Sequence, residues 1–212
     1  MIQIDDAGSG SLIGGTCVGL YWPKNDVFKY DFVPLECYSP ENFKQKKYQE
    51  YVVYTIERFF IELGVPKDEE IQLCQGYIFD CLREYLTLKG YRWKSVKIEG
   101  LLQEVVEKTF EDYAVSLGLP QSYIRYTKYP FHFHKLLRWV YADYDSRKRF
   151  CKSGWKSWQK YGNLPIKTSY GNMNLAGYFC LKCGKKIKAK SPIKILEFMS
   201  NKKNIIYVHQ DC

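Results

Sequence analysis

The chain has 212 residues, 46% of them hydrophobic and 17% aromatic, a composition that supports a folded core and excludes an intrinsically disordered protein. Its net charge is +9, and no stretch approaches the roughly 20 consecutive apolar residues of a membrane-spanning helix, which excludes an integral helical membrane protein. The N-terminal residues lack the basic and apolar regions of a secretory signal, so we expect a cytoplasmic protein with no membrane partner.

The beginning of the chain predicts three antiparallel strands. Alternating apolar and polar residues indicate strands over residues 2–6, 17–22 and 27–35. A glycine-rich turn over residues 7–16 joins the first two strands, and a turn over residues 23–26 joins the second to the third. We therefore expect the fold to open with an antiparallel meander.

Helices then alternate with short strands. Apolar residues at helical spacing predict helices over residues 48–64, 77–88, 102–117 and 134–150. Short apolar runs predict two more strands, at residues 71–74 and 95–99. This order favours an α/β fold with a mixed sheet and flanking helices. We expect that domain to occupy residues 1–150, followed by a basic, loop-like linker at residues 151–177 and a small zinc module at residues 178–212.

Four residues near the C-terminus have the spacing of metal ligands. Cys180 and Cys183 form one close pair, His209 and Cys212 form another, and 25 residues lie between the pairs. Two such pairs can close a tetrahedron around one zinc ion, with Gly184 allowing the tight turn after the first pair. Because all four ligands come from the protein, we expect a structural zinc. The alternative is chance thiols beside a surface histidine.

The pattern resembles treble-clef and zinc-ribbon knuckles, families that often bind nucleic acid or protein. The remaining five cysteines are isolated along the chain, and we expect them to be small buried thiols.

The basic charge belongs to the C-terminal third. Residues 1–146 carry 17 lysines and arginines against 21 acidic residues, whereas residues 147–212 carry 15 against two. This asymmetry favours a nucleic-acid partner, although a lysine-rich face can also serve solubility alone. Aromatic residues are interleaved with the first lysines, which suits base stacking beside phosphate contacts. The predicted nucleic-acid contacts are Lys152, Lys156, Lys160, Lys182, Lys185, Lys186 and Lys188.

The run Asp5-Asp6-Ala7-Gly8-Ser9-Gly10, at the end of the first predicted strand, resembles the opening motif of ribonuclease HII, Asp-Glu-Ala-Gly-Arg-Gly. Asp6 replaces the glutamate and Ser9 replaces the arginine. The resemblance implies a ribonuclease H-like fold, in which carboxylates hold two magnesium or manganese ions over a phosphodiester. Adjacent carboxylates repel each other, so they persist at low cost only when solvated or neutralised by cations. The alternative is a solvated acidic turn.

The resemblance calls for two further carboxylates. Glu99, within Ile98-Glu99-Gly100, is the nearest match to the third acid of ribonuclease HII, which lies in a Val-Asp-Gly type of segment. Glu57 is a competitor, since Holliday-junction resolvases draw an acid from a different element. Asp143, within Val140-Tyr-Ala-Asp143 and preceded by Tyr129-Pro130, is the nearest match to the fourth.

Helical geometry places Asp143 on the buried side of the predicted helix over residues 134–150. At 100° per residue Asp143 falls within the arc of Leu136 and Val140, whereas Asp145 faces solvent. A buried carboxylate needs compensation, either from a metal ion or from Arg147 one turn further on.

These patterns predict a metal-dependent nuclease with Asp5, Asp6, Glu99 and Asp143 as catalytic metal ligands. The missing arginine leaves the substrate open between RNA–DNA hybrids, branched DNA and single strands. Two other functions remain: a non-catalytic nucleic-acid-binding protein on a degenerate nuclease scaffold, and a zinc-containing adaptor for protein interactions.

Overall fold

The structure is a computed structural model that describes residues 1–125 and 132–212. The Tyr129-Pro130 dipeptide noted above lies outside these residues. The chain divides into two compact units. The N-terminal unit comprises Met1–Ser9 and Gly14–Tyr113, and the C-terminal unit comprises Gly10–Ile13 and Ala114–Cys212.

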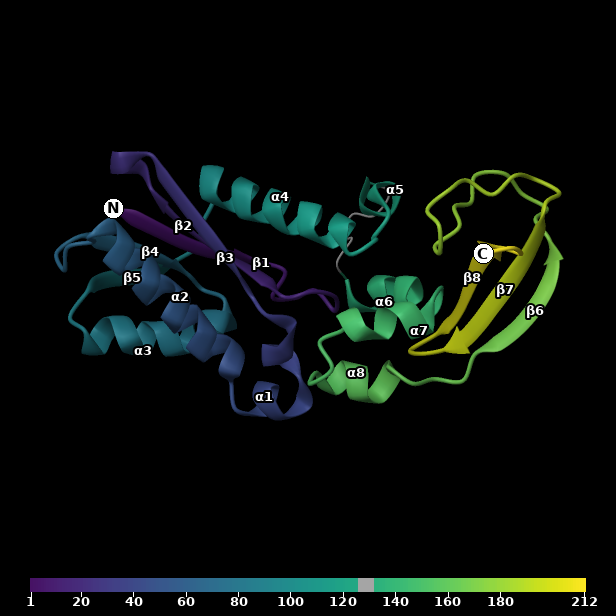
Figure 1. The fold of residues 1–212 in the computed structure, drawn as a ribbon, viewed down its shortest axis with the longest axis horizontal. Coiled ribbons are helices and arrows are strands. Elements are labelled where there is room, and N and C mark those ends of the chain that lie inside the picture. Colours follow the sequence, from purple (N-terminus) through teal and green to yellow (C-terminus); the bar gives the residue numbers. More distant parts are fainter. Residues whose placement is uncertain (126–131) are drawn as a thin grey trace. The chain divides into compact units, whose positions relative to one another are not determined.

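The N-terminal unit is built on a five-stranded mixed sheet (Figure 1). Its strands are β1 (Ile2–Ala7), β2 (Thr16–Trp22), β3 (Val27–Val33), β4 (Glu70–Cys74) and β5 (Arg92–Val96). They lie in the order β3-β2-β1-β4-β5. The first three pair antiparallel, while β4 pairs parallel to both β1 and β5. The predicted meander is confirmed, and β5 lies three residues earlier than predicted.

Helices cover both faces of this sheet (Figure 1). One face packs against α2 (Lys47–Leu63) and α3 (Asp80–Leu88), and a buried cluster that includes Ile4, Leu20 and Ile56 fills the space between. The other face lies against α4 (Leu101–Ser116): a Cβ atom on Gly19 would come within 2.3 Å of Val106. The remaining short helices of the unit are η1 (Pro23–Asn25), η2 (Leu35–Tyr38), α1 (Pro40–Lys44) and η3 (Tyr77–Phe79).

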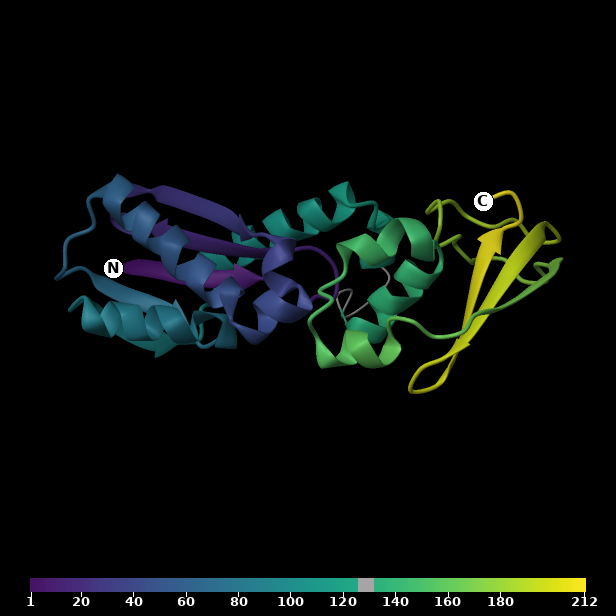
Figure 2. The ribbon, with the colours of Figure 1, turned by 60° about the horizontal axis from the view of Figure 1, so that its bottom comes forward.

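The C-terminal unit combines short helices with a three-stranded antiparallel sheet, seen from two directions in Figures 1 and 2. Its strands, in the order β6-β7-β8, are β6 (Lys167–Asn172), β7 (Pro192–Met199) and β8 (Lys203–His209). Its helices are α5 (Gln121–Arg125), α6 (Phe133–Tyr141), α7 (Tyr144–Arg147), η4 (Lys148–Phe150) and α8 (Lys156–Tyr161).

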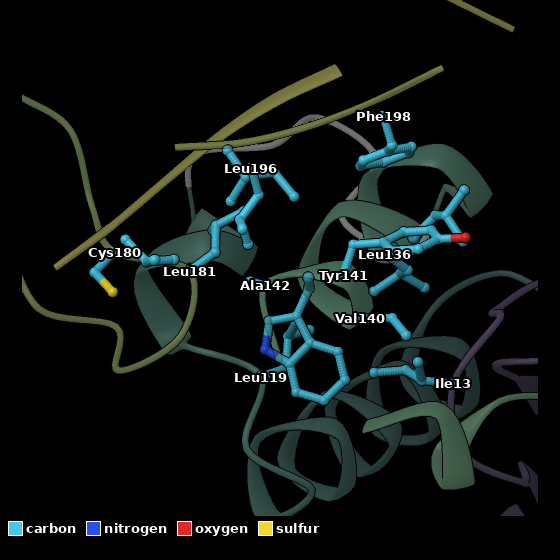
Figure 3. Close-up of a cluster of buried hydrophobic side chains, with 14 of the residues drawn as sticks. Ile13, Leu119, Leu136, Val140, Tyr141, Ala142, Cys180, Leu181, Leu196 and Phe198 are labelled. Carbon is cyan, nitrogen blue, oxygen red and sulfur yellow. The ribbon is translucent and has the colours of Figure 1, made fainter. Parts of the chain in front are cut away.

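The core of this unit joins α6 to the sheet (Figure 3). The ring of Tyr141 on α6 stacks on that of Phe198 on β7, with 4.3 Å between their centroids. Leu196 of β7, Leu181 and Cys180 belong to the same buried cluster. Cys180, the first residue of the zinc-ligand pattern, is therefore part of a substantial apolar core, whereas Cys183 and Cys212 are exposed.

The structure differs from the predicted organisation in two places. The division between units falls at Tyr113 and Ala114, within α4, whereas the sequence predicted a boundary at residue 150. The predicted linker at residues 151–177 contains α8 and β6, and its Met173 is buried in the core. Neither element has a buried residue, so neither shows the apolar spacing from which helices and strands are predicted. Among the described residues, no helix has the length and apolar character needed to cross a bilayer.

Candidate functional site

The four predicted zinc ligands come together in the C-terminal unit. One ligand atom from each of Cys180, Cys183, His209 and Cys212 lies within 4.8 Å of the others. The Cys180 and Cys212 sulfurs are 3.8 Å apart, and Nδ1 of His209 lies 3.3 Å from the Cys183 sulfur and 3.7 Å from the Cys212 sulfur. A tetrahedral zinc with bonds of about 2.3 Å to sulfur places its sulfurs roughly 3.8 Å apart. The donor set and its spacing therefore fit a closed tetrahedral metal site.

The backbone around the first cysteine pair is shaped for this role. The chain turns back after Cys183, with the N–H of Gly184 donating to the Cys180 carbonyl at 2.8 Å and that of Cys180 donating to Lys185 at 2.9 Å. Gly184 has φ +74°, a left-handed conformation that side-chain-bearing residues rarely adopt. The turn function predicted for this glycine is confirmed.

The thiols of this cluster influence one another. Burial alone would raise the pKa of the Cys183 thiol, but the backbone N–H of Lys185 and hydrogen bonds from Cys180 and Cys212 lower it below its ordinary value. Burial and the neighbouring Cys183 raise the pKa of Cys212 to about 12. Metal binding would release the protons that these thiols hold.

Arg147 holds the same loop in place through hydrogen bonds to its backbone. Its guanidinium is buried and donates to the carbonyl oxygens of Trp139, Leu181 and Lys182 at 2.7, 2.8 and 2.7 Å. It also lies over the Trp139 ring, 4.1 Å from the centroid. Arg147 was predicted as a possible ion-pair partner of Asp143, whose charge does act on it, but its hydrogen bonds go to backbone carbonyls of α6 and of the cysteine loop.

A second candidate metal site lies at the end of β1. Asp5, Asp6 and Cys74 each place one ligand atom within 4.8 Å of the others. The parallel register that pairs Ile4 with Leu73 brings Asp5 beside Cys74, the last residue of β4. The two predicted aspartates are therefore joined by a cysteine that the sequence had indicated only as an isolated buried thiol. No sequence signal identifies Cys74, because its proximity follows from strand pairing.

The carboxyl group of Asp5 is buried and is influenced by the charge of another acidic residue. Its side chain belongs to a residue only 5% exposed, and this burial raises the pKa of the carboxyl above its ordinary value. A hydrogen bond from the Cys74 thiol acts in the opposite direction, while the charge of Glu107 raises the pKa further. The same burial and hydrogen bond raise the pKa of Cys74 to about 12, so the thiol acts here as a proton donor. A cation would offset the cost of ionising Asp5.

Glu107 is the acidic residue that sequence reasoning missed. It lies on α4, between Val106, which packs on Gly19, and Phe110, which packs on Gly8. A Cβ atom on Gly8 would come within 2.1 Å of the Phe110 ring, so this glycine makes room for the helix. Glu107 therefore belongs to the helix that covers the sheet face of Asp5, a relationship that only the packed fold reveals.

The structure does not bring Glu99 and Asp143 into this cluster. Glu99 follows β5, is exposed, and forms an ion pair with Lys97. Asp143 belongs to the C-terminal unit, where its carboxylate lies 3.5 Å from the Lys182 ammonium. The helical placement of Asp143 was wrong because α6 ends at Tyr141 and the backbone of Asp143 is not helical, with φ −154° and ψ 66°. Asp145 is solvent-exposed, as predicted.

The competing acid Glu57 is also committed elsewhere. It lies on α2, where its carboxylate accepts a hydrogen bond of 2.8 Å from the Tyr85 hydroxyl.

Most of the predicted nucleic-acid lysines are accessible. Lys152 is the exception, because it is fully buried and cannot contact a phosphate from that position. Lys182 is half-buried beside Asp143. The others are exposed: Lys156, Lys160, Lys185, Lys186 and Lys188.

Comparison with known proteins identifies no relative: no protein-family model matches the chain, and no curated protein matches it.

Proposed function

We propose that the protein is a divalent-metal-dependent nuclease that hydrolyses phosphodiester bonds of a nucleic acid. The observation that carries this proposal is the convergence of Asp5 and Asp6 at the end of β1, where one of the two carboxyl groups is buried beside a third polar group. Buried acids are costly unless something positive compensates them. The mixed sheet with helices on both faces is also the architecture implied by the resemblance to ribonuclease HII.

The residues present fit a divalent cation. Asp5 and Asp6 offer oxygen ligands of the kind that magnesium and manganese prefer, and Glu107 adds negative charge within electrostatic range of Asp5. Bound cations would polarise the phosphodiester and activate water. The chain's own contribution is to fix the two carboxylates on a central strand and, through the Cys74 thiol, to orient Asp5 by a hydrogen bond.

The C-terminal unit would hold the nucleic acid, with zinc as a structural ion at Cys180, Cys183, His209 and Cys212. This unit carries 19 lysines and arginines against four acidic residues, whereas the N-terminal unit carries 13 against 19. Such a surface attracts a phosphate backbone.

A cleavage assay tests the proposal. Purified protein is incubated with labelled RNA–DNA hybrids, branched DNA and single strands, with magnesium, manganese or calcium. We expect cleavage of at least one substrate with magnesium or manganese and none with calcium, whose looser coordination suits the reaction poorly. Asp5→Asn should abolish cleavage, and Asp145→Asn, which alters an exposed carboxylate, should not. Cleavage that persists in Asp5→Asn would contradict the proposal.

A second function is favoured by one observation: the predicted third acid is exposed and the fourth lies in the other unit, so within the described part of the chain two carboxylates join the cluster with Cys74. A non-catalytic nucleic-acid-binding protein would bind the same substrates without cleaving them. Binding with no cleavage under any of the metal conditions would favour this alternative.

A further inference from the structure

A pocket of about 390 Å³ lies in the C-terminal unit beside the cysteine loop. Its walls come from α5 and the residues just before it, from Arg138 on α6, from the segment that leads into the first cysteine pair, and from Tyr207 on β8. This volume falls within the range of roughly 300–1,000 Å³ that is typical of small-ligand sites. No acidic side chain is among the described residues that line it.

Aromatic rings form much of its surface. Tyr123, Tyr178, Phe179 and Tyr207 all line the pocket. The rings of Tyr178 and Tyr207 meet edge to face, with centroids 5.2 Å apart and planes at 83°. In such a pair the edge of one ring meets the face of the other. Tyr178 is 39% exposed, which leaves its ring accessible from solvent.

Two cationic side chains stand beside these rings. Arg138 lines the pocket and donates from Nη2 to the carbonyl of Ile205 at 2.9 Å, which fixes its guanidinium against the wall. Lys186 also lines the pocket and is exposed, and its segment is held by a bridge to Phe179. The pocket thus combines flat apolar walls with positive charge at its rim, in a unit with a large excess of basic residues.

We propose that this pocket binds one unpaired nucleotide, with the base against Tyr178 and Tyr207 and its phosphate near Arg138 and Lys186. Aromatic stacking beside a cation is the usual recognition of single-stranded nucleic acid. A base within a duplex cannot enter a pocket without leaving its stack, so the site selects single strands, loops or strand ends. The proposal rests on the proposed nucleic-acid function, but it does not require catalysis.

The test compares single-stranded and fully paired oligonucleotides of equal length by fluorescence anisotropy with the full-length protein. Tyr178→Ala should weaken single-strand binding about tenfold, the loss typical of one stacking contact, and leave duplex binding unchanged. Tyr178→Trp should retain single-strand binding. Tyr170→Ala removes an exposed tyrosine from β6 in the same unit and serves as the matched control, with no expected effect.

A second variant, Tyr178→Leu, guards against loss of structure. It keeps apolar bulk at the pocket and removes the aromatic faces, so it should weaken single-strand binding as Tyr178→Ala does while retaining zinc and the melting temperature. An equal loss for single strands and duplexes, or a loss no greater than that of Tyr170→Ala, would overturn the pocket proposal while leaving the nuclease proposal standing. Failure of the parent protein to bind any nucleic acid would instead remove the proposed function itself.

Discussion

At the scale of single residues, the surroundings of Asp5 have opposing effects on the ionisation of its carboxyl group. Its carboxyl group is buried and near Glu107, so its negative charge is poorly accommodated, yet the Cys74 thiol donates a hydrogen bond that suits the ionised form. A carboxyl group that needed only to fill space would be replaced at little cost by an amide. A cation bound to the carboxylate would offset the cost of burying its charge.

This conflict predicts that Asp5→Asn stabilises the cation-free protein near neutral pH. The raised pKa means that the folded state holds the Asp5 proton more tightly than the unfolded state, so stability falls as pH rises from the ordinary aspartate range through the folded-state pKa. The asparagine side chain avoids that loss and can still accept from the Cys74 thiol. Thermal melts in EDTA should therefore show a higher melting temperature for Asp5→Asn at pH 7, and the difference should shrink toward pH 4.

Adding manganese or magnesium should reverse the order of the melting temperatures of the parent protein and Asp5→Asn. Cations that bind only the folded state raise the melting temperature of the parent protein, and Asp5→Asn should lose that rise. Asp145→Asn, at an exposed position, should behave as the parent in both conditions. A parent protein insensitive to both cations, with Asp5→Asn no more stable than the parent at neutral pH, would show that the β1 cluster is only a tight acidic turn.

At the scale of elements, periodicity identified most helices and strands of the N-terminal unit and missed β6, β7 and β8 of the C-terminal unit. The strands of the meander, β4 and the three helices α2, α3 and α4 follow from alternation or helical spacing that is strong enough to read locally. The break between α6 and α7 does not, since apolar residues continue across Ala142 while the backbone of Asp143 leaves the helix. The zinc ligands could be predicted from the sequence because they come in close pairs. Cys74 and Glu107 could not be predicted as neighbours of Asp5, because they reach it only through strand pairing and helix packing.

The packing of these elements also changes how much of the C-terminal fold we expect to depend on zinc. The sequence indicated a small module held together by metal, but Cys180, Leu181 and Ile187 are buried in one core with α6 and β7. Arg147 further anchors the loop through Leu181 and Lys182. Metal removal should therefore loosen the cysteine loop without unfolding the β7–β8 pair.

We expect about one zinc per chain, which elemental analysis measures. Chelation should speed amide hydrogen exchange at residues 180–186 and 210–212, while amides in the β7–β8 ladder keep their protection. Cys183→Ser should lower the zinc content, and Cys37→Ser, a half-buried thiol of the N-terminal unit, should not. Absence of zinc from the parent protein would contradict the proposed zinc site. Loss of β7–β8 protection on chelation would instead support the original prediction of a module that folds only with metal.

At the scale of the whole molecule, charge is divided between the units. The N-terminal unit, which holds the aspartate cluster, has more acidic than basic residues, and the C-terminal unit has nearly five basic residues for each acidic one. Under the proposed function, a nucleic acid would be attracted chiefly to the C-terminal unit and cations to the N-terminal one. Affinity for the polyanion and the proposed metal chemistry are thus assigned to different parts of the chain.

This division predicts a salt dependence that can be localised. Each lysine–phosphate contact contributes roughly 0.7 to 0.9 to the slope of log affinity against log salt concentration, because it releases a condensed counterion. Replacing the exposed residues Lys185, Lys186 and Lys188 together by glutamine should reduce the magnitude of that slope by up to roughly 2 to 3. Replacing three exposed lysines of the N-terminal unit, Lys24, Lys44 and Lys46, should leave the slope nearly unchanged.

The measurement is a series of binding titrations between about 50 and 200 mM salt. A flat response in the parent protein would point to lysines that serve solubility alone, and equal losses from the two triple variants would show that the C-terminal unit has no special part in holding the polyanion.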